Sequence, residues 1–492
     1  MGSAAPDAIL DFTKLRRTAF SQDTASSPVA LAQAADQLPA STGAAGLEPG
    51  ERASWGRYPR VEHRGVAFVT SREQPIDFST DASYLGFGQG RSYGDSCLNE
   101  GGVLLDNTRL RRFIAFDEST GLLRCEAGVT LAEVLEFCVP RGWFLPTTPG
   151  TKFVSIAGAI ANDIHGKNHH VAGTFGRHVT CFELARSNGE RLLCSPSENA
   201  GLYRATIGGL GLTGFITWVE FRLKRVPGPY IAMESIRFGS LDEFFELSEA
   251  SDRLFEYTMS WVDCMAMGRD TGRGLFMRGN HAWQKRIPGL DPNPKQRLGM
   301  PFNLPEFALN GTAVKAFNWL LYHKQLAPLV TATTPYDPFF YPLDSISDWN
   351  RMYGRRGFMQ HQCVVPHDAA RQALRAMFNA TSASGQGSFL AVLKTFGDLP
   401  SPGMMSFPRP GATLALDFPF RGDKTLKLLD RLDDIAIAVG GAVYPAKDAR
   451  MSRRTFEASF PRWRDFEPYI DPKFSSSFWR RVTGVSSSRS EA

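Results

Sequence analysis

The chain has 492 residues, of which 43% are hydrophobic, 21% charged and 12% aromatic. These values are those of a globular protein, and they exclude collagen, coiled coils and chains that are disordered throughout. The formal net charge of +5 permits a phosphorylated ligand or an anionic membrane surface, but it is too small to indicate nucleic acid.

The cysteine pattern indicates a reducing compartment. Seven cysteines are scattered along the chain without a CxxC pair, so neither a disulfide framework nor a structural zinc site is expected. The N-terminus lacks a signal-peptide pattern, and no run of 18 apolar residues predicts a helix that spans a membrane. We therefore expect a cytoplasmic chain without a metal site.

The length predicts two or three domains, and the composition places their boundaries. Residues 1–54 are rich in Ala, Ser, Thr, Gln and Gly, which predicts a poorly ordered arm. Short strand-like runs and one helix follow, and Pro227-Gly228-Pro229 marks the end of this first domain, residues 55–226. Its expected strands are 65–70, 103–106, 113–116 and 122–127, and its helix begins at a capping box of Thr130 and Glu133.

Residues 227–441 are expected to form a second domain of antiparallel α+β type. Its pattern is strand, helix, strand, strand, helix, and a second capping box joins Ser240 to Glu243. The expected strands are 230–238, 358–365, 389–394 and 413–418, and the expected helices include 368–379 and 424–439. Residues 316–322 are apolar and aromatic, which favours a buried helix over a lid or a membrane-surface contact.

Two glycine-rich stretches suggest nucleotide binding. Gly209-Leu210-Gly211-Leu212-Thr213-Gly214 matches GxGxxG, but β-forming residues follow it, whereas a Rossmann fingerprint opens a helix. Residues 86–95 hold four glycines within nine positions, with Arg, Ser and Tyr between them. Such a loop lets backbone N–H groups approach an anionic ligand closely; the alternative is a tight surface turn.

A third stretch, residues 149–170, is rich in glycine, alanine and histidine. Small residues around Gly158 suit a pyrophosphate held by backbone amides, and His165 and Lys167 are expected to face a reaction centre. Four of the nine histidines lie within residues 165–178, so a metal site is an alternative. A glycine directly after His165 disfavours the helix that such a site would need, and we expect structural or exposed roles for the other three histidines.

These motifs resemble those of FAD-linked oxidases of the vanillyl-alcohol oxidase type, and within that superfamily they are most similar to the decaprenylphosphoryl-β-D-ribose 2′-oxidases. The resemblance covers nearly the whole chain after residue 54. Its most specific part is Asp163-Ile164-His165-Gly166-Lys167-Asn168-His169-His170. It continues through Gly211-Leu212-Thr213-Gly214, Trp349-Asn350-Arg351, Ser406-Phe407-Pro408, Asp417-Phe418-Pro419 and Ala446-Lys447-Asp448.

The resemblance implies an α+β flavoprotein of two domains, a split PCMH-type FAD-binding domain and an antiparallel-sheet substrate domain that caps the flavin. Residues 227–441 would form the cap, and residues 442–492 would return to the FAD-binding domain. Many relatives tether FAD through a histidine in the first loop; this chain has Arg91 there, which implies non-covalent FAD. The implied FAD-binding residues are Gly86, Gly88, Gln89, Gly90, Arg91, Ser92, Tyr93, Gly94, Asp95, Ser96, Gly150, Ser155, Ile156, Ala157, Gly158, Asn162, Asp163, Ile164, His165, Ile216 and Tyr444.

The implied chemistry is hydride transfer from a secondary alcohol to flavin N5. It needs a base for the hydroxyl proton and a cation near the flavin N1–C2 carbonyl. Lys447 is the leading catalytic candidate, as that cation, followed by His165 and Lys167 for proton handling. The sequence does not decide which of the three acts as the base.

Substrate-binding candidates come from the second domain. Gln360 and Gln362 are two apart on one expected strand, so they face the same side and suit sugar hydroxyls. Lys394 is expected to end a strand, where it suits a phosphate, and Tyr341 is the fourth candidate. The chain departs from mycobacterial relatives at three places: Thr413 and Ala415 replace Asn and Cys, and Phe340 replaces Tyr.

The activity implied is oxidation of the 2′-hydroxyl of a polyprenyl-phosphoryl-β-D-ribose to the 2′-keto sugar, the first half of epimerisation to an arabinose donor for cell-envelope glycans. An NAD(P)H-dependent short-chain reductase would be the pathway partner, and the enzyme would be cytoplasmic or peripheral at the inner face of the plasma membrane. One alternative is a soluble aldonolactone or alditol oxidase that uses FAD. The other is a non-catalytic lipid- or sugar-binding protein with a vestigial flavin site.

Overall fold

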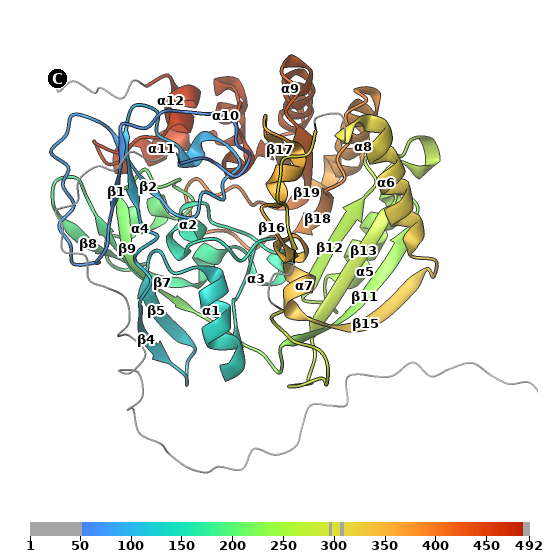
Figure 1. Ribbon diagram of the computed structural model, residues 1–492, viewed down its shortest axis with the longest axis horizontal. Helices are drawn as coiled ribbons and strands as arrows, with labels where there is room; N and C mark the ends of the chain where they lie inside the picture. Colours follow the sequence, from blue (N-terminus) through green and yellow to red (C-terminus); the bar gives the residue numbers. More distant parts are fainter. Residues whose placement is uncertain (1–51, 295–297, 306–308, 486–492) are drawn as a thin grey trace, which may run out of the picture. The chain divides into compact units, whose positions relative to one another are not determined.

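The computed structural model describes residues 52–294, 298–305 and 309–485 (Figure 1). The predicted arm, residues 1–54, lies outside these residues except for its last three. Those three are fixed in place, because the Arg52 guanidinium pairs with the buried Asp106 carboxylate at 3.1 Å and Ser54 is buried. Helices and largely antiparallel sheets make up the described chain, which confirms the α+β class.

The N-terminal half contains two main sheets. A parallel sheet has the order β1 (Gly65–Phe68), β3 (Val103–Asp106), β2 (Tyr84–Phe87). An antiparallel sheet has the order β4 (Phe113–Asp117), β5 (Leu122–Glu126), β9 (Phe215–Arg222), β7 (Val179–Ala185), β8 (Arg191–Cys194). Because β9 follows directly on Gly214, the GxGxxG sequence enters a strand, as predicted.

An eight-stranded antiparallel sheet dominates the C-terminal half, on the right of Figure 1. Its order is β15 (Leu329–Pro335), β11 (Tyr230–Phe238), β13 (Gly274–His281), β12 (Tyr257–Val262), β18 (Ala391–Phe396), β19 (Gly411–Pro419), β17 (Phe358–Val365), β20 (Ala442–Val443). Two short pairs are β6 (Trp143–Phe144) with β10 (Lys224–Arg225), and β14 (Leu298–Gly299) with β16 (Ile346–Ser347). The predicted strand 358–365 is β17, whereas β18 begins two residues later than predicted.

The helices of the N-terminal half are short: α1 (Leu131–Cys138), α2 (Ile156–Ala161), α3 (His169–Ala172) and α4 (Ala200–Thr206). Those of the C-terminal half are α5 (Leu241–Ser251), α6 (Gly311–Lys324), α7 (Tyr336–Phe340), α8 (His367–Ala383), α9 (Asp423–Ala438), α10 (Arg453–Ser459), α11 (Trp463–Phe466) and α12 (Ser477–Thr483). The Thr130–Glu133 capping box of α1 is confirmed, with hydrogen bonds in both directions. Among the described residues, no helix is both long and apolar enough to cross a membrane.

Helix α6 corrects the prediction that residues 316–322 are buried. The segment is helical, but the residues of α6 that are buried are Val314 and Asn318. Asn318 Nδ2 donates to the Ser388 carbonyl, so a polar side chain helps to attach the helix to the sheet. Phe317, Trp319 and Leu320 are left 48, 52 and 61% exposed.

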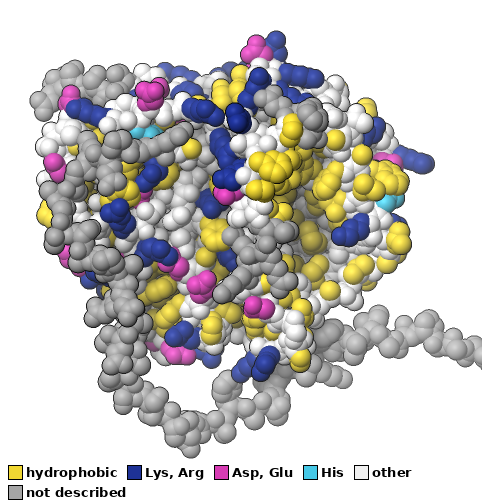
Figure 2. Space-filling view, viewed as in Figure 1, with side chains coloured by type: hydrophobic (Ala, Val, Ile, Leu, Met, Phe, Trp, Pro, Cys, Tyr) yellow, Lys and Arg dark blue, Asp and Glu magenta, His cyan; other side chains and the backbone are white. Residues whose placement is uncertain are grey.

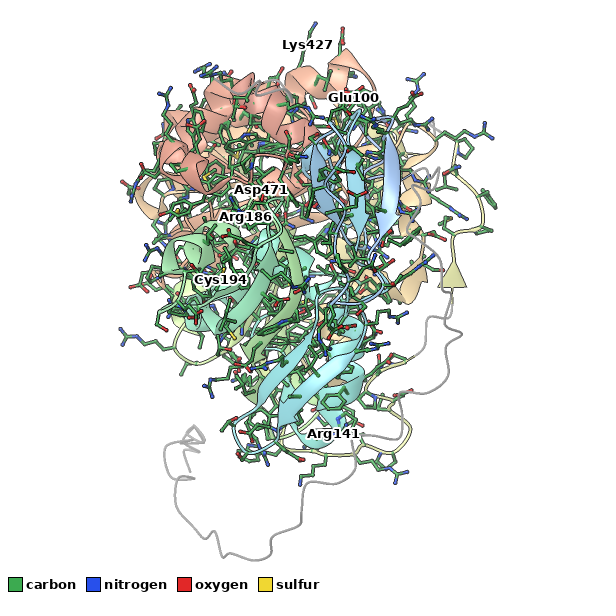
Figure 3. All side chains as sticks on the ribbon, turned by 90° about the vertical axis from the view of Figure 1, so that its left-hand side faces the viewer. Glu100, Arg141, Arg186, Cys194, Lys427 and Asp471 are labelled. Atoms are coloured by element: carbon green, nitrogen blue, oxygen red, sulfur yellow. The ribbon has the colours of Figure 1, made fainter. Side chains whose placement is uncertain are left out.

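The C-terminal segment contacts both halves of the described chain. β20 pairs with β17 in the eight-stranded sheet. Further along, Asp471 pairs at 3.1 Å with Arg186, the residue directly after β7, and Figure 3 shows these two side chains together. Helix α12 packs on the 3-10 turn η2 (Asp95–Cys97), where Arg481 pairs with Asp95 at 2.7 Å. The segment thereby connects the eight-stranded sheet to the loop that follows β2.

Candidate functional site

A cavity lies between the glycine-rich loops of the N-terminal half and the inner strands of the eight-stranded sheet. Backbone and small side chains of the loops form one wall, and polar side chains of β17, β18, β19 and the 3-10 turn η9 (Pro445–Lys447) form the other. The predicted site residues that line it are Gly86, Gly88, Gln89, Gly90, Arg91, Ser92, Tyr93, Ser96, Gly150, Ser155, Ala157, Gly158, Asn162, Ile164, His165, Lys167, Ile216, Gln360, Gln362, Lys394, Tyr444 and Lys447.

The loop after β2 needs glycine because other atoms approach its backbone closely. A Cβ at Gly88 would lie 2.3 Å from Ser155 Oγ. At Gly90, whose φ is +59°, a Cβ would lie 2.8 Å from the Ala53 carbonyl oxygen. Since the same loop lines the cavity, its glycines form a ligand-facing wall and not merely an exposed turn.

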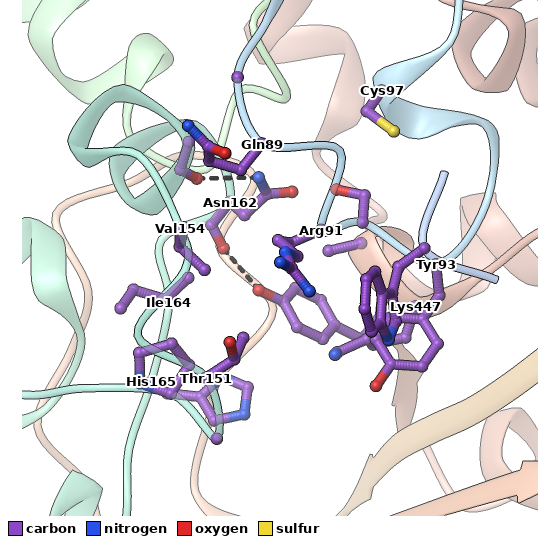
Figure 4. A pocket seen from close by; sticks show the side chains of 18 of the residues that line it. Gln89, Arg91, Tyr93, Cys97, Thr151, Val154, Asn162, Ile164, His165 and Lys447 are labelled. Atoms are coloured by element: carbon purple, nitrogen blue, oxygen red, sulfur yellow. Dashed lines mark hydrogen bonds between the residues drawn. The ribbon is translucent and has the colours of Figure 1, made fainter. Parts of the chain in front are cut away.

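The second loop is held in shape by its own polar groups (Figure 4). Ser155 Oγ accepts from Gly158 N and caps α2, and Asn162 Nδ2 donates to the Gly158 carbonyl at 2.9 Å. The Tyr444 hydroxyl donates to the Asn162 carbonyl at 2.9 Å. The segment after β20 is therefore attached directly to the loop that faces the cavity.

Several buried polar atoms of the cavity wall have no hydrogen-bond partner within the described chain. They are Arg91 Nε, Ser96 Oγ, Asn107 Oδ1 and His165 Nδ1. Because buried polar groups are normally paired, these atoms indicate a ligand with polar groups at several points. The pyrophosphate, ribityl chain and ring of FAD fit such a wall. Around Gly158 the backbone amides of Ile156, Ala157 and Gly158 already donate within the chain, so the first glycine-rich loop is the better source of N–H groups for the pyrophosphate.

Arg91 stands in this wall between aromatic rings. Its guanidinium carbon lies 4.0 Å from the centroid of a Trp55 ring and 5.5 Å from that of Phe153. Burial lowers the pKa of Arg91, and the charge of Asp344 opposes that shift. Burial in turn raises the pKa of the Asp344 carboxyl to about 6. Stacking on aromatic rings gives Arg91 a fixed place as a cation beside the cavity.

Side chains of the eight-stranded sheet form the opposite wall. Gln360 and Gln362 both line the cavity, which confirms that they share a face of β17. Gln362 Nε2 lies 3.0 Å from His165 Nε2. Because the amide N–H donates, the histidine nitrogen accepts, and the imidazole carries its proton on Nδ1. Lys394 lies inside β18, not at its end, and its Nζ donates to the Gly166 carbonyl at 3.0 Å.

Three lysines converge on the cavity. Burial lowers the pKa of Lys167 to about 8. Burial, with the charges of Lys167 and Lys447, lowers the pKa of Lys394 to about 7. Burial also lowers the pKa of Lys447 to about 8, and the Asp417 carboxylate opposes this shift. Lysines perturbed in this way are typical of sites that exchange protons or bind anions.

Four of the predicted FAD-binding residues do not line the cavity: Gly94, Asp95, Ile156 and Asp163. A Cβ at Gly94 would lie 1.9 Å from the Asp448 carbonyl oxygen, so this glycine permits a close backbone contact. Asp95 pairs with Arg481, and Ile156 belongs to the apolar core. Asp163 accepts hydrogen bonds from Ser401 and Ser406. These residues lie on the side of the loops away from the cavity and hold the loops in place.

Tyr341, predicted to bind substrate, also does not line the cavity. It is fully buried, and its hydroxyl forms a hydrogen bond of 2.6 Å with Thr148 Oγ1. The preceding residue, Phe340, lines the cavity instead. The wall at this point is therefore apolar, where a tyrosine would have offered a hydroxyl.

Other residues of the site were not predicted from the sequence. Trp55, Cys97, Asn107, Thr148, Met259, Leu343, Asp344, Leu390 and Val392 line the cavity. Asp417 lies behind its wall, hydrogen-bonded to Gln360. Strand periodicity offered a signal for it, because Thr413, Ala415 and Asp417 alternate along β19 and so share a face.

The remaining histidines of the third stretch have structural contacts. The His169 ring packs on Phe396 with centroids 4.4 Å apart. His170 and His178 each contact a backbone carbonyl at 3.0 Å. Within the described residues, no group of three or more His, Cys, Asp or Glu side chains is arranged to hold a metal ion.

The chain matches known proteins over most of its length. Residues 78–195 match a protein family described as an FAD binding domain. The chain is 35% identical over 411 residues to the decaprenylphosphoryl-β-D-ribose oxidase of Mycolicibacterium smegmatis, covering 80% of this chain and 88% of that protein. It is 31% identical over 373 residues to an uncharacterised protein of Streptomyces coelicolor, covering 72% of this chain and 100% of that protein.

A shorter match is 36% identical over 137 residues to a Neurospora crassa protein named as a D-arabinono-1,4-lactone oxidase. It covers 27% of this chain and 24% of that protein. The two long matches extend well beyond the FAD binding domain, whereas this one is little longer than that domain.

Proposed function

Because the chain belongs to the family of FAD-linked decaprenylphosphoryl-β-D-ribose oxidases, we propose that its substrate is a polyprenyl-phosphoryl-β-D-ribose. It is an FAD-dependent oxidoreductase acting on CH–OH groups. Bound FAD supplies a hydride acceptor. With that acceptor in place, oxidation would remove a hydride from C2′ and leave a 2′-keto sugar, and a base of this chain would take up the hydroxyl proton. The observation that carries the proposal is that two glutamines and three lysines line the cavity, with Gln360, Gln362, Lys394 and Lys447 opposite the FAD-fitting loops and Lys167 on the loop side.

FAD is bound without a covalent link in this proposal. The first glycine-rich loop would hold the pyrophosphate through backbone N–H groups, the second loop would line it, and Ile216 and Tyr444 would pack beside the cofactor. Arg91 occupies the place of the tethering histidine of many relatives, and a guanidinium forms no such bond. Acid precipitation should therefore release all of the flavin into the supernatant, whereas flavin that stays in the pellet would contradict a dissociable cofactor.

The sheet wall recognises the sugar phosphate. The amides of Gln360 and Gln362 bind hydroxyls, and Lys394 binds the phosphate. His165 Nε2 already accepts from Gln362, which leaves this nitrogen engaged. Lys447 is therefore the group best placed to meet the 2′-hydroxyl and the flavin. Lys167, on the loop side of the cavity, adds a third positive charge, and its Nζ lies 3.5 Å from the Phe340 carbonyl.

The proposed function also implies a division of the chain into two domains. Residues 55–226 form an FAD-binding domain of split PCMH type, and residues 227–441 form a substrate domain that caps the flavin. Residues 442–492 return to the FAD-binding domain. The contacts of Tyr444 with the second loop and of Arg481 with η2 support this return.

The keto product defines the next step. Epimerisation requires hydride return to the same carbon from the opposite face, so an NAD(P)H-dependent short-chain reductase is the proposed pathway partner. The product would be the arabinose donor for cell-envelope glycan synthesis. Both enzymes would then act in the cytoplasm, at the inner face of the membrane that holds the lipid carrier.

A surface on α6 and β15 supports peripheral membrane contact, and we call it the α6–β15 face. Its exposed apolar side chains are Phe317, Trp319, Leu320, Leu326, Leu329 and Val330. Figure 2 shows hydrophobic side chains gathered over this region. Residues 309–336 contain no Asp or Glu and two lysines, which suits an anionic lipid surface. Phe317 packs on Phe389, next to cavity-lining Leu390, so the face adjoins the site.

Membrane contact is tested by sedimentation with vesicles of phosphatidylglycerol and phosphatidylcholine, compared with phosphatidylcholine alone. Replacing Phe317, Trp319 and Leu320 by serine should abolish binding to the anionic vesicles. Leu254→Ser, at a residue 70% exposed elsewhere, is the matched control. Equal binding by the triple variant and the wild type would remove the α6–β15 face from the proposal.

Anaerobic titration tests the proposed activity. Polyprenyl-phosphoryl-β-D-ribose should bleach the visible flavin absorbance stoichiometrically and yield a keto sugar. Bleaching by aldonolactones or free alditols, with none by the prenyl-phosphoryl ribose, would show a soluble sugar oxidase instead. A chain that cannot be loaded with FAD would contradict both enzyme functions.

A further inference from the structure

Asp417 is a buried carboxylate that the proposed chemistry does not use. It is 1% exposed and lies on β19 opposite Gln360 of β17. Gln360 Nε2 donates to Asp417 Oδ1, whereas Oδ2 is buried without a hydrogen-bond partner in the described chain. A buried carboxylate that is only half satisfied is unfavourable unless an opposite charge compensates it.

The compensating charge is that of Lys447. Asp417 is the group whose charge raises the pKa of this lysine. Lys447 Nζ lies 3.8 Å from the centroid of the Tyr93 ring, and Figure 4 shows the two side chains together. Tyr93 is in turn hydrogen-bonded to Gln360. Since no ion pair joins Asp417 directly to Lys447 among the described residues, Gln360 and Tyr93 connect the two charges.

We propose that Asp417 is a positioning residue, which keeps Lys447 protonated in the cavity and orients the Gln360 amide. The inference rests on the proposed place of Lys447 beside FAD. Asp417 does not line the cavity, so it acts on ligands only through these two side chains.

The balance of charges agrees with this role. Burial raises the pKa of Asp417 to about 7, and Gln360 and Lys447 oppose that shift. Burial lowers the pKa of Lys447 to about 8, and Asp417 opposes that one. The other titratable or charged groups around the pair are Tyr93, Arg91, Tyr353, His165 and Lys394. The two cations among them are Arg91 and Lys394. The charge of Lys447 lowers the pKa of Lys394, so like charges repel in this wall, and Asp417 is the carboxylate that opposes the lowering of the pKa of Lys447.

Asp417→Asn removes the negative charge but keeps the shape of the side chain. The asparagine carbonyl can still accept from Gln360, so the packing of β17 on β19 is preserved while the negative charge is lost. The pKa of Lys447 should then fall. If it falls by about one unit from about 8, the protonated fraction at pH 8 drops about five-fold. Below about pH 6.5 the variant and the wild type should behave alike.

The measurement is the visible spectrum of bound oxidised FAD against pH, without substrate. The wild type should show a transition near pH 8 that is absent in Lys447→Met, and Asp417→Asn should move it to lower pH. Asp433→Asn removes another buried carboxylate, which pairs with His361 and Arg450, and should leave the transition in place. If Asp417→Asn does not fold, Gln360→Met weakens the same connection and should move the transition in the same direction.

The outcomes separate this inference from the proposed function. An unchanged transition in folded Asp417→Asn overturns the role of Asp417 alone. A transition that persists in Lys447→Met overturns the place of Lys447 beside the flavin, and the role of Asp417 with it. Stopped-flow reduction supplies the second readout: the alkaline loss of rate should begin at lower pH in Asp417→Asn.

Discussion

The two walls of the cavity are built on different principles. The loop wall presents backbone and small side chains, and its glycines are required by contacts such as that of Gly88 with Ser155. The sheet wall presents charged and amide side chains from alternate positions of neighbouring strands. Cofactor binding and substrate chemistry are therefore separable in this chain. Substitutions in the loop wall should change FAD retention, and those in the sheet wall should change reduction of FAD.

The largest effect is expected at Lys447. Lys447→Ala should retain FAD but lose reduction by substrate, because the variant lacks the cation proposed beside the flavin and the hydroxyl. Removal of one preorganised charge or donor at a developing charge typically costs about 10²–10³-fold, so the rate of flavin reduction should fall by about that factor. Anaerobic stopped-flow spectroscopy measures the rate, and the absorbance ratio of flavin to protein measures retention.

Lys427→Ala is the matched control, since Lys427 is an exposed lysine of α9, labelled in Figure 3. It should reduce at the wild-type rate. If Lys447→Ala loses FAD together with activity, the separation of the two walls fails, because a residue of the sheet wall would then hold the cofactor.

A smaller effect is expected in the loop wall. Gly88→Ala places a Cβ 2.3 Å from Ser155 Oγ, so the Ser155 hydroxyl, which caps α2 and shapes the second loop, must move. FAD affinity should fall by about ten-fold or more, which corresponds to about 1.4 kcal/mol. Equilibrium dialysis of the reconstituted protein measures it, and the rate of reduction at saturating FAD should change much less.

Gly239→Ala controls for the loss of a glycine, because its Cβ would have its nearest contact at 3.4 Å, away from the cavity. It should bind FAD as the wild type does. Should Gly88→Ala bind FAD with unchanged affinity, the glycines of the first loop would be features of a turn and not of a cofactor site.

The loop wall was also the easier one to predict. Its residues are contiguous in sequence, so motifs of glycine and small residues identify them before any fold is known. The sequence equally predicts the face of β17, because Gln360 and Gln362 alternate. It does not distinguish the residues that touch the ligand from those that support them. Asp95 lies in the same motif as Arg91, yet its partner is Arg481, nearly 400 residues away.

The sheet wall depends on register between strands that are distant in sequence. Asp417 meets Gln360 only because β17 and β19 pair in one register, and no local pattern reveals that register. The same limit explains why the sequence pointed to Tyr341 as a substrate-binding residue. A shift of one position decides whether Phe340 or Tyr341 faces the cavity. The burial predicted for residues 316–322 was wrong for another reason. Apolar composition predicts burial, but this helix is anchored by Val314, outside that segment, and by the polar Asn318.

The smallest effect should appear in stability, at Lys394. Its pKa in the folded chain is lowered to about 7 by burial and by two neighbouring lysines, so the unfolded chain binds more protons between about pH 7 and its ordinary pKa of 10.5. The stability contributed by this site therefore rises with pH across that window. Lys394→Met removes the penalty and should raise the melting temperature by a few degrees at pH 7, with little gain near pH 10.

Differential scanning calorimetry at both pH values, with saturating FAD, measures the effect, and Lys427→Met is the exposed control. An equal gain at the two pH values would indicate better packing and not the removal of a buried charge. The sheet wall would then hold no destabilising buried charge at Lys394, and the proposed difference between the two walls would be smaller. A gain confined to neutral pH, with weaker binding of the phosphorylated substrate, would show that this wall trades stability for recognition of an anion.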